Sequence, residues 1–173
     1  MSTPVNDPWA EYITPSDVHA LLAKYSGEFT MEITMSMGEG TEPSLIRAES
    51  ENAMLLGGRF LKMNQHGTMP GMDYQAIMTM GYNNADETFA LTTITNMGTG
   101  TLSLSGEWDN DTRTATLSGE LTNPLSGGKI KVRQTVNFAD EDTILIESYD
   151  REGDLPERKT LQYKLVRLSS EFL

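Results

Sequence analysis

Short runs in which apolar and polar side chains alternate are the feature that most constrains this chain. Between Glu28 and Met37 every second residue is apolar, beginning with Phe29, and the residues between are polar. Successive side chains of an extended strand point to opposite faces, so this segment has one apolar and one polar face. The pattern predicts a half-buried antiparallel strand over 28–37.

Similar runs continue to the end of the chain and are separated by short turns rich in Gly, Pro, Asn and Asp. We expect nine further strands at 45–56, 59–65, 72–82, 88–96, 101–108, 112–121, 129–138, 143–150 and 158–168. Connections this short join antiparallel neighbours, because a parallel crossover needs about a dozen residues. Ten sequential strands avoid open edges by closing, so we predict an all-β fold, a single antiparallel up-and-down β-barrel. A two-sheet sandwich is the alternative.

The first part of the chain is expected to differ from the rest. Residues 1–13 read as an extended N-terminal arm carrying Trp9 and Tyr12. Ser16 then provides helix-start chemistry, and apolar residues at helical spacing continue until Gly27. One short helix should therefore precede the barrel, and 14–173 should form a single domain.

The charge and the absence of cysteine exclude several classes of function. Lys and Arg number 13 against 25 Asp and Glu, which gives a net charge of −12. Such a chain repels phosphate backbones and anionic lipids, so we expect neither a nucleic-acid nor a membrane partner. No cysteine is present, which excludes disulfides and thiolate chemistry. The start has no signal-like apolar segment, so we expect a cytoplasmic protein. We expect it to be a monomer or a homodimer.

A family resemblance rests on several motifs distributed along the chain. They are Gly81-Tyr82-Asn83-Asn84, Phe89, Thr95-Asn96-Met97-Gly98-Thr99-Gly100, Gly57-Gly58-Arg59-Phe60-Leu61, Met69-Pro70-Gly71-Met72 and Asn123-Pro124. In these the chain resembles the bacterial family known as domain of unknown function 1579. The resemblance implies a lipocalin-like (calycin) barrel of unassigned activity. The chain departs from the family at Thr93, where an aromatic is common, and at Phe29, where Trp is usual.

The resemblance also implies a way of closing the barrel. Lipocalin-like proteins typically carry Gly-x-Trp at the start of the first strand, and an arginine of the last strand covers that ring. The matching positions here are Gly27-Glu28-Phe29 and Arg167. We therefore expect Arg167 to pack over Phe29 and to donate to carbonyls near the helix end.

No motif in the chain carries a catalytic or metal-binding mechanism. Gly98-x-Gly100 leads into a strand instead of a helix, so it does not match a dinucleotide site. The run from Asp109 begins like a calcium loop but lacks the required glycine. His19 and His66 are the only histidines, and a haem site through His66 is the remaining alternative. We expect no metal and no cofactor.

The inward-facing register supplies the candidate binding residues. Methionine suits either an irregular core or a cavity that adapts to apolar ligands. Polar groups on the same faces need partners, which can be other side chains, water or a ligand. The candidate ligand-binding residues are Met31, Met35, Asn52, Tyr74, Met78, Met80, Tyr82 and Gln134.

These observations favour a protein that binds a small, largely apolar molecule inside the barrel. One alternative is an enzyme that uses Tyr74, Tyr82 or Gln134 with a carboxylate for proton transfer on a bound molecule. Another is a structural or interaction protein with a filled core. A carboxylate buried beside a tyrosine would favour the enzyme, and a solid interior would favour the structural protein.

Overall fold

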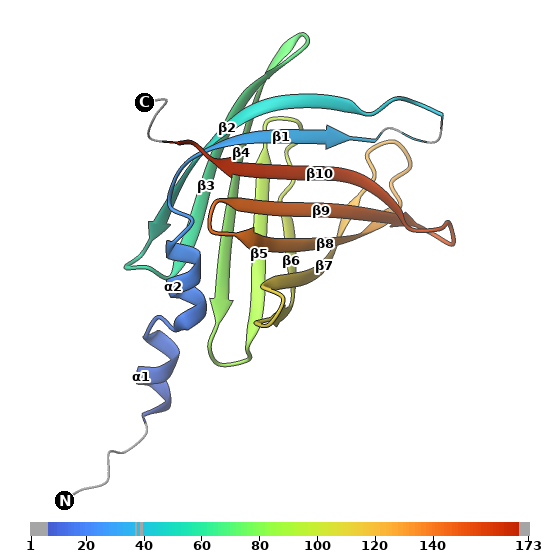
Figure 1. Cartoon of the computed structure of the whole chain (residues 1–173). Helices are drawn as coiled ribbons and strands as arrows, with labels where there is room; N and C mark the ends of the chain where they lie inside the picture. Colours follow the sequence, from blue (N-terminus) through green and yellow to red (C-terminus); the bar gives the residue numbers. More distant parts are fainter. Residues whose placement is uncertain (1–6, 37, 39, 170–173) are drawn as a thin grey trace, which may run out of the picture.

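Ten antiparallel strands form a closed barrel with two short helices before it (Figure 1). The structure is a computed structural model and describes residues 7–36, 38 and 40–169. The strands are β1 Gly27–Met35, β2 Ser44–Leu55, β3 Phe60–Met69, β4 Met72–Asn83, β5 Thr88–Thr95, β6 Leu102–Asp109, β7 Thr114–Thr122, β8 Lys129–Asp140, β9 Thr143–Glu152 and β10 Arg158–Arg167. The predicted up-and-down barrel is confirmed. Residues 1–6 and Met37, which the sequence places in the arm and the first strand, lie outside the described residues.

Each strand pairs with its sequence neighbour, and β1 pairs with β10 to close the barrel. The closing register runs from Phe29 opposite Arg167 to Met35 opposite Leu161. In Figure 1, β8, β9 and β10 run across the direction of β4 and β5. Inward-facing side chains from both walls therefore meet across the interior.

One predicted turn is part of a strand instead. The sequence predicts the third strand over 59–65 and a turn from Gly67, but β3 continues to Met69. Gly67 is needed there because β2 passes close by: an added Cβ would lie 2.7 Å from the Arg47 carbonyl oxygen. The turn itself contains Gly71, whose φ of 86° favours glycine.

The helices are α1, Pro8–Ile13, and α2, Asp17–Ala23. The extended conformation predicted for this part of the arm is wrong, because Asp7 caps a helix by accepting from the Trp9 N–H at 3.0 Å. Helix α1 buries no residue. Helix α2 is the predicted one, and its Val18, Leu21 and Leu22 pack against the core.

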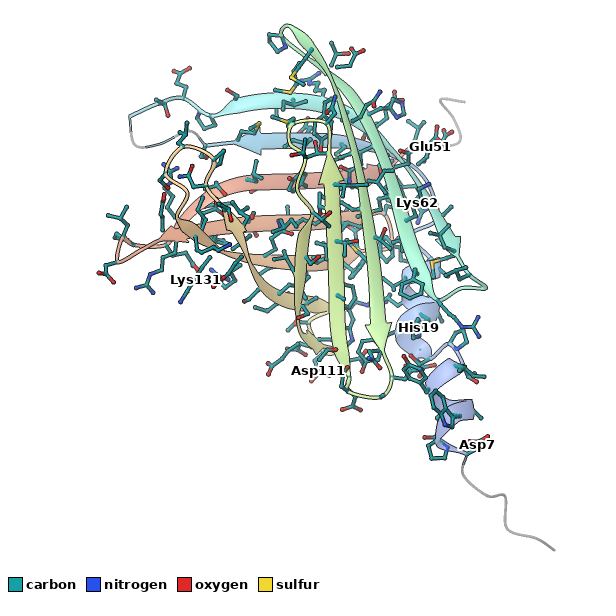
Figure 2. The ribbon with its side chains drawn as sticks, turned by 180° about the vertical axis from the view of Figure 1, so that it is seen from behind. Asp7, His19, Glu51, Lys62, Asp111 and Lys131 are labelled. Atoms are coloured by element: carbon teal, nitrogen blue, oxygen red, sulfur yellow. The ribbon has the colours of Figure 1, made fainter. Side chains whose placement is uncertain are left out.

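Helix α2 covers one end of the barrel, which we call the closed end. Figure 2 shows His19 of α2 and Asp111 of the β6–β7 turn at this end. The Tyr25 hydroxyl donates to the Asp140 carbonyl at 2.6 Å, and the Tyr25 ring centroid lies 4.8 Å from that of Phe138. Tyr25 and Phe138 are each 1% exposed, so aromatic side chains fill this end.

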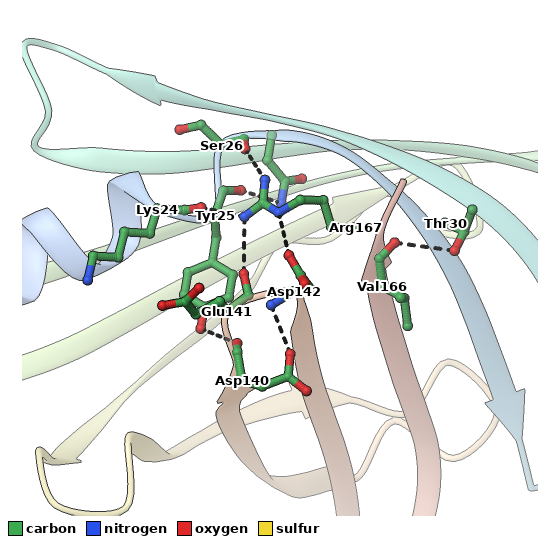
Figure 3. A network of polar contacts seen from close by, with 10 residues as sticks. Lys24, Tyr25, Ser26, Thr30, Asp140, Glu141, Asp142, Val166 and Arg167 are labelled. Atoms are coloured by element: carbon green, nitrogen blue, oxygen red, sulfur yellow. Dashed lines mark hydrogen bonds and ion pairs between the residues drawn. The ribbon is translucent and has the colours of Figure 1, made fainter. Parts of the chain in front are cut away.

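Arg167 of β10 joins the closed end to the first strand (Figure 3). Its Cζ lies 4.8 Å from the Phe29 ring centroid. Its guanidinium donates to the carbonyls of Ser26 and Lys24, and to Asp142 Oδ1 at 3.0 Å. The helix end, the first strand and the β8–β9 turn are therefore held by one side chain.

Candidate functional site

A group of polar side chains points into the barrel from opposite walls, and we call it the interior polar cluster. Its members come from β3, β4, β8, β9 and β10, and each is at most 8% exposed. They are Gln65, Tyr74, Gln134, Ser148 and Tyr163. The alternation of each strand puts them on the inner face, and barrel closure brings strands far apart in sequence to one interior.

Hydrogen bonds within the cluster engage only one of the two polar atoms in each glutamine side chain. The Tyr74 hydroxyl donates to Gln65 Oε1 at 3.2 Å, and Gln134 Nε2 donates to Ser148 Oγ at 3.2 Å. Gln65 Nε2 and Gln134 Oε1 are buried without a hydrogen-bond partner among the described residues, as is Thr93 Oγ1 of β5. Native proteins leave few such atoms unpaired, because each costs free energy unless a partner is supplied.

Both tyrosines of the cluster are neutral donors at physiological pH. Burial raises the pKa of Tyr74 to about 12. Burial also raises the pKa of Tyr163, and the neighbouring Tyr74 and Asp150 raise it further. Neither hydroxyl can therefore serve as a base near neutral pH.

Asp150 of β9 continues the inward register of its strand near the end of the barrel opposite α2, and its charge acts on Tyr163. It is partly buried, and burial raises the pKa of the Asp150 carboxyl. A hydrogen bond from Thr160 and the charge of Arg158 act in the opposite direction and lower it. The sequence analysis associates an enzyme with a carboxylate buried beside a tyrosine, whereas Asp150 is only partly buried.

Apolar side chains at the end opposite α2 form what we call the mouth. They face inward, pack against the core and are only partly buried. They are Met35, Met69, Leu102, Leu121, Ile130 and Leu161. Tyr163 follows Leu161 by two residues on the same face of β10, so the interior polar cluster lies directly beneath the mouth.

Six of the eight predicted binding residues lie in three regions of the structure. Tyr74 and Gln134 belong to the interior polar cluster, and Met35 belongs to the mouth. Met31, Met78 and Met80 are at most 1% exposed and pack tightly in the core, so a ligand reaches them only if neighbouring side chains move.

The remaining two predicted residues lie towards the closed end. Asn52 is fully engaged, because its Oδ1 accepts from the Ser50 hydroxyl at 2.7 Å and its Nδ2 donates to the Tyr25 carbonyl at 3.0 Å. Tyr82 lies beside α2, where its carbonyl is 2.9 Å from His19 Nε2. Neither contributes to the interior polar cluster.

The sequence analysis missed Gln65, Ser148, Tyr163, Thr93 and Asp150 as site residues. The alternation that places Asn52 and Gln134 inside would also have found these residues, because each continues the inward register of its strand. The meeting of the opposite walls depends on barrel closure, which local alternation does not reveal.

A concave region lies on the outside of the barrel. This outer pocket has a volume of about 510 Å³ and lies between the helices and β3, β4 and β5. Tyr12, Ile13 and Phe60 supply its apolar lining, and Thr92 is one of its polar residues. Because of this apolar lining, the outer pocket is an alternative site to the barrel interior for small apolar molecules.

A family model covers most of the chain. The model described as "Protein of unknown function (DUF1579)" matches residues 14–167. The chain belongs to this family. The predicted family resemblance is thereby confirmed, and the ten-stranded barrel is consistent with the lipocalin-like description.

Comparisons beyond the family add no function. No curated protein sequence matches the chain significantly. Among solved structures, the one titled "Structure of EF1p2_mFAP2b bound to DFHBI" is 9% identical with a TM-score of 0.47, covering 87% of this chain and 97% of that one. A likeness at this level supports no statement about what the family member binds.

Two properties of the described residues bear on other classes of site. No described helix is long and apolar enough to cross a membrane. Within the same part of the chain, no group of three or more His, Asp or Glu side chains could hold a metal ion.

Proposed function

We propose that this protein binds a small, largely apolar molecule in the half of the barrel that carries the mouth. The observation that carries the proposal is the set of buried atoms without partners among the described residues: Gln65 Nε2, Gln134 Oε1 and Thr93 Oγ1. Burying a polar group without a hydrogen bond costs about 1–3 kcal/mol. A bound molecule would supply the missing partners.

The surroundings of these atoms fit a molecule that is otherwise apolar. The mouth consists of Met, Leu and Ile side chains, and methionine adapts its shape to different ligands. Binding sites for small molecules typically combine such an apolar lining with a few convergent polar groups. The partly exposed mouth offers the route by which a ligand would enter.

Titration with Nile red, an uncharged apolar dye, tests the proposal. We expect fluorescence enhancement with micromolar affinity. Thr93→Trp places a large ring beside the interior polar cluster, and we expect it to weaken dye binding at least about tenfold because it fills the space that the ligand needs. Thr92→Trp is the matched control, since Thr92 is the exposed, outward-facing neighbour.

The two variants also separate the barrel interior from the outer pocket. Thr92 lines the outer pocket, so weaker binding by Thr92→Trp with unchanged binding by Thr93→Trp would place the dye outside and overturn the proposal. If Thr93→Trp does not fold, as judged by far-UV circular dichroism, Thr93→Leu provides a smaller obstruction. Absence of any dye binding by the unmodified chain also overturns the proposal.

A second candidate function is proton transfer on the bound molecule, and it is favoured by Asp150, a partly buried carboxyl in the inward register of β9 whose charge acts on Tyr163. A carboxyl group can act as a general acid or base towards a bound substrate, and burial raises the pKa of the Asp150 carboxyl. The test uses any small molecule that co-purifies with the protein. The protein is incubated with this molecule in D2O, and the mass of the extracted molecule is then measured. Deuterium bound to carbon with the unmodified chain, and none with Asp150→Asn, would support this function.

A further inference from the structure

We propose that the polar group of the bound molecule is uncharged and both donates and accepts hydrogen bonds, as a carboxamide or an alcohol does, and that the barrel rejects carboxylates. This inference rests on the proposed function. It concerns the chemical class of the ligand, which the binding proposal leaves open.

The two glutamines define the hydrogen bonds that the ligand must make. Gln65 uses its Oε1 on Tyr74 and leaves Nε2, a donor, whereas Gln134 uses its Nε2 on Ser148 and leaves Oε1, an acceptor. A ligand group that accepts from the first and donates to the second satisfies both. Rotating an amide by half a turn exchanges donor and acceptor, because the Tyr74 and Ser148 hydroxyls can both donate and accept. When both amides rotate, the pair still offers one donor and one acceptor, and in every orientation the free atoms belong to neutral amides.

The interior provides no positive charge for a carboxylate. No Asp, Glu, Lys or Arg is among the buried residues that the structure describes. Among the His, Asp, Glu, Lys and Arg residues that the structure describes, His19 alone is buried. It lies on α2 at the closed end. A carboxylate that entered would lose its hydration and gain no charged partner.

The charged side chains near the mouth do not change this balance. Asp150 is partly buried on β9 and would repel an anion. Arg158, which lies opposite Asp150 in the β9–β10 register, is exposed to solvent, and Lys159 is paired with Glu147 at 2.6 Å. Glu152 accepts hydrogen bonds from Asn123 and Ser126 at the rim. The net charge of −12 adds a general repulsion of anions.

The tyrosine hydroxyls also provide no charge for a cation. Tyr74 and Tyr163 stay protonated at neutral pH, since burial raises the pKa of both groups. A cationic head group would find no Asp or Glu among the buried residues that the structure describes, since Asp150 is only partly buried. An uncharged group fits the cluster better than either ion.

Competition against bound Nile red with four molecules that share a twelve-carbon tail tests the inference on the full chain. We expect dodecanamide and dodecan-1-ol to displace the dye at pH 7.5 at concentrations at least about tenfold lower than dodecanoate or dodecylammonium. Displacement by dodecanoate as effective as that by dodecanamide overturns the inference. Displacement by dodecylammonium alone also overturns it and would assign recognition to Asp150.

Variants of the glutamines supply the second measurement. Gln65→Met combined with Gln134→Met keeps side-chain length but removes the amides, and we expect the affinity for dodecanamide relative to that for Nile red to fall at least about tenfold. Gln75→Met is the matched control, because Gln75 faces outward on β4. If the double variant does not fold, Gln134→Met alone is measured. Unchanged competition by dodecanamide overturns the inference.

The two proposals fail in different ways. If Nile red does not bind, or binds in the outer pocket, the proposed function fails. If Nile red binds and Thr93→Trp weakens it, but dodecanoate competes as well as dodecanamide, only the inference on ligand class fails.

Discussion

The guanidinium of Arg167 lies over the ring of Phe29, with Cζ 4.8 Å from the ring centroid, and so connects the last strand to the first. The same group donates to the Ser26 carbonyl at 2.7 Å and to the Glu141 carbonyl at 3.2 Å. A phenylalanine ring attracts a cation less strongly than a tryptophan ring does, but the carbonyl contacts do not depend on the ring. The hydrogen bonds should therefore contribute more to stability than the stacking.

Arg167→Ala should lower the free energy of unfolding by about 1–3 kcal/mol, because carbonyls at the helix end and in the β8–β9 turn lose their donors. Urea unfolding followed by circular dichroism measures the change. Lys164→Ala is the control, since Lys164 is exposed on the outer face of the same strand. Equal effects of the two substitutions would contradict the structural role of Arg167.

Thr93→Val should stabilise the ligand-free protein by about 1 kcal/mol. The substitution preserves side-chain shape and removes a buried hydroxyl that has no partner among the described residues. Thr92→Val on the exposed face should change stability by no more than about 0.5 kcal/mol. Thermal unfolding of the three proteins checks the prediction. A loss of stability in Thr93→Val would show that the hydroxyl is satisfied within the folded chain.

Gly106→Ala should destabilise the barrel towards the upper end of the range of about 1–3 kcal/mol for overpacking. An added Cβ would lie 1.9 Å from the Thr116 carbonyl oxygen on β7, and backbone cannot move aside as a flexible side chain can. Gly98→Ala meets no atom within 4 Å and serves as the control. Denaturant midpoints of the two variants should differ clearly, and matching midpoints would refute the close approach of β6 and β7.

Stability should fall as the pH drops below about 6.5, the ordinary pKa of histidine. Burial lowers the pKa of His19, so the unfolded chain binds the proton more readily and protonation favours unfolding. The neutral form also lets Nδ1 accept from the Ser16 N–H at 2.9 Å. The stabilisation that neutral His19 provides is fully present above the pKa of this histidine in the unfolded chain. It is lost as the pH falls through the lower pKa of His19 in the folded protein.

Unfolding midpoints between pH 7.5 and 5.5 measure this effect. His19→Gln should flatten the pH dependence over this window, whereas His66→Gln should retain the part due to His19. A dependence that survives His19→Gln unchanged would assign the effect to another group.

The fold was predictable because it depends on local patterns. Alternation from Phe29 onward defines β1, and short turns define antiparallel pairing, so each hairpin can be read from its own residues. One error arose where a contact between strands determines the structure. Gly67 resembles a turn residue in the sequence, but it lies in β3, where β2 passes close to it. Helix α1 was missed although Asp7 and Pro8 carry helix-start chemistry.

The candidate site was predictable only in part. Alternation places Tyr74 and Gln134 inside, but which inward polar atoms are paired depends on side chains of other strands. Asn52 and Gln134 occupy similar inward positions in the sequence pattern. Both the oxygen and the nitrogen of the Asn52 amide form hydrogen bonds, whereas only the nitrogen of the Gln134 amide does. That difference exists only once the barrel is closed.

The pairing of β1 with β10 has a consequence for the biosynthesis of this protein. Until the last strand has left the ribosome, β1 and β9 both present unpaired backbone donors and acceptors to the surroundings. Such edges can recruit strands of other nascent chains, and the two partners of the final pairing are separated by most of the chain, which slows closure. Premature termination within the last strand is therefore the type of synthesis error that would most directly convert this chain into an aggregating one.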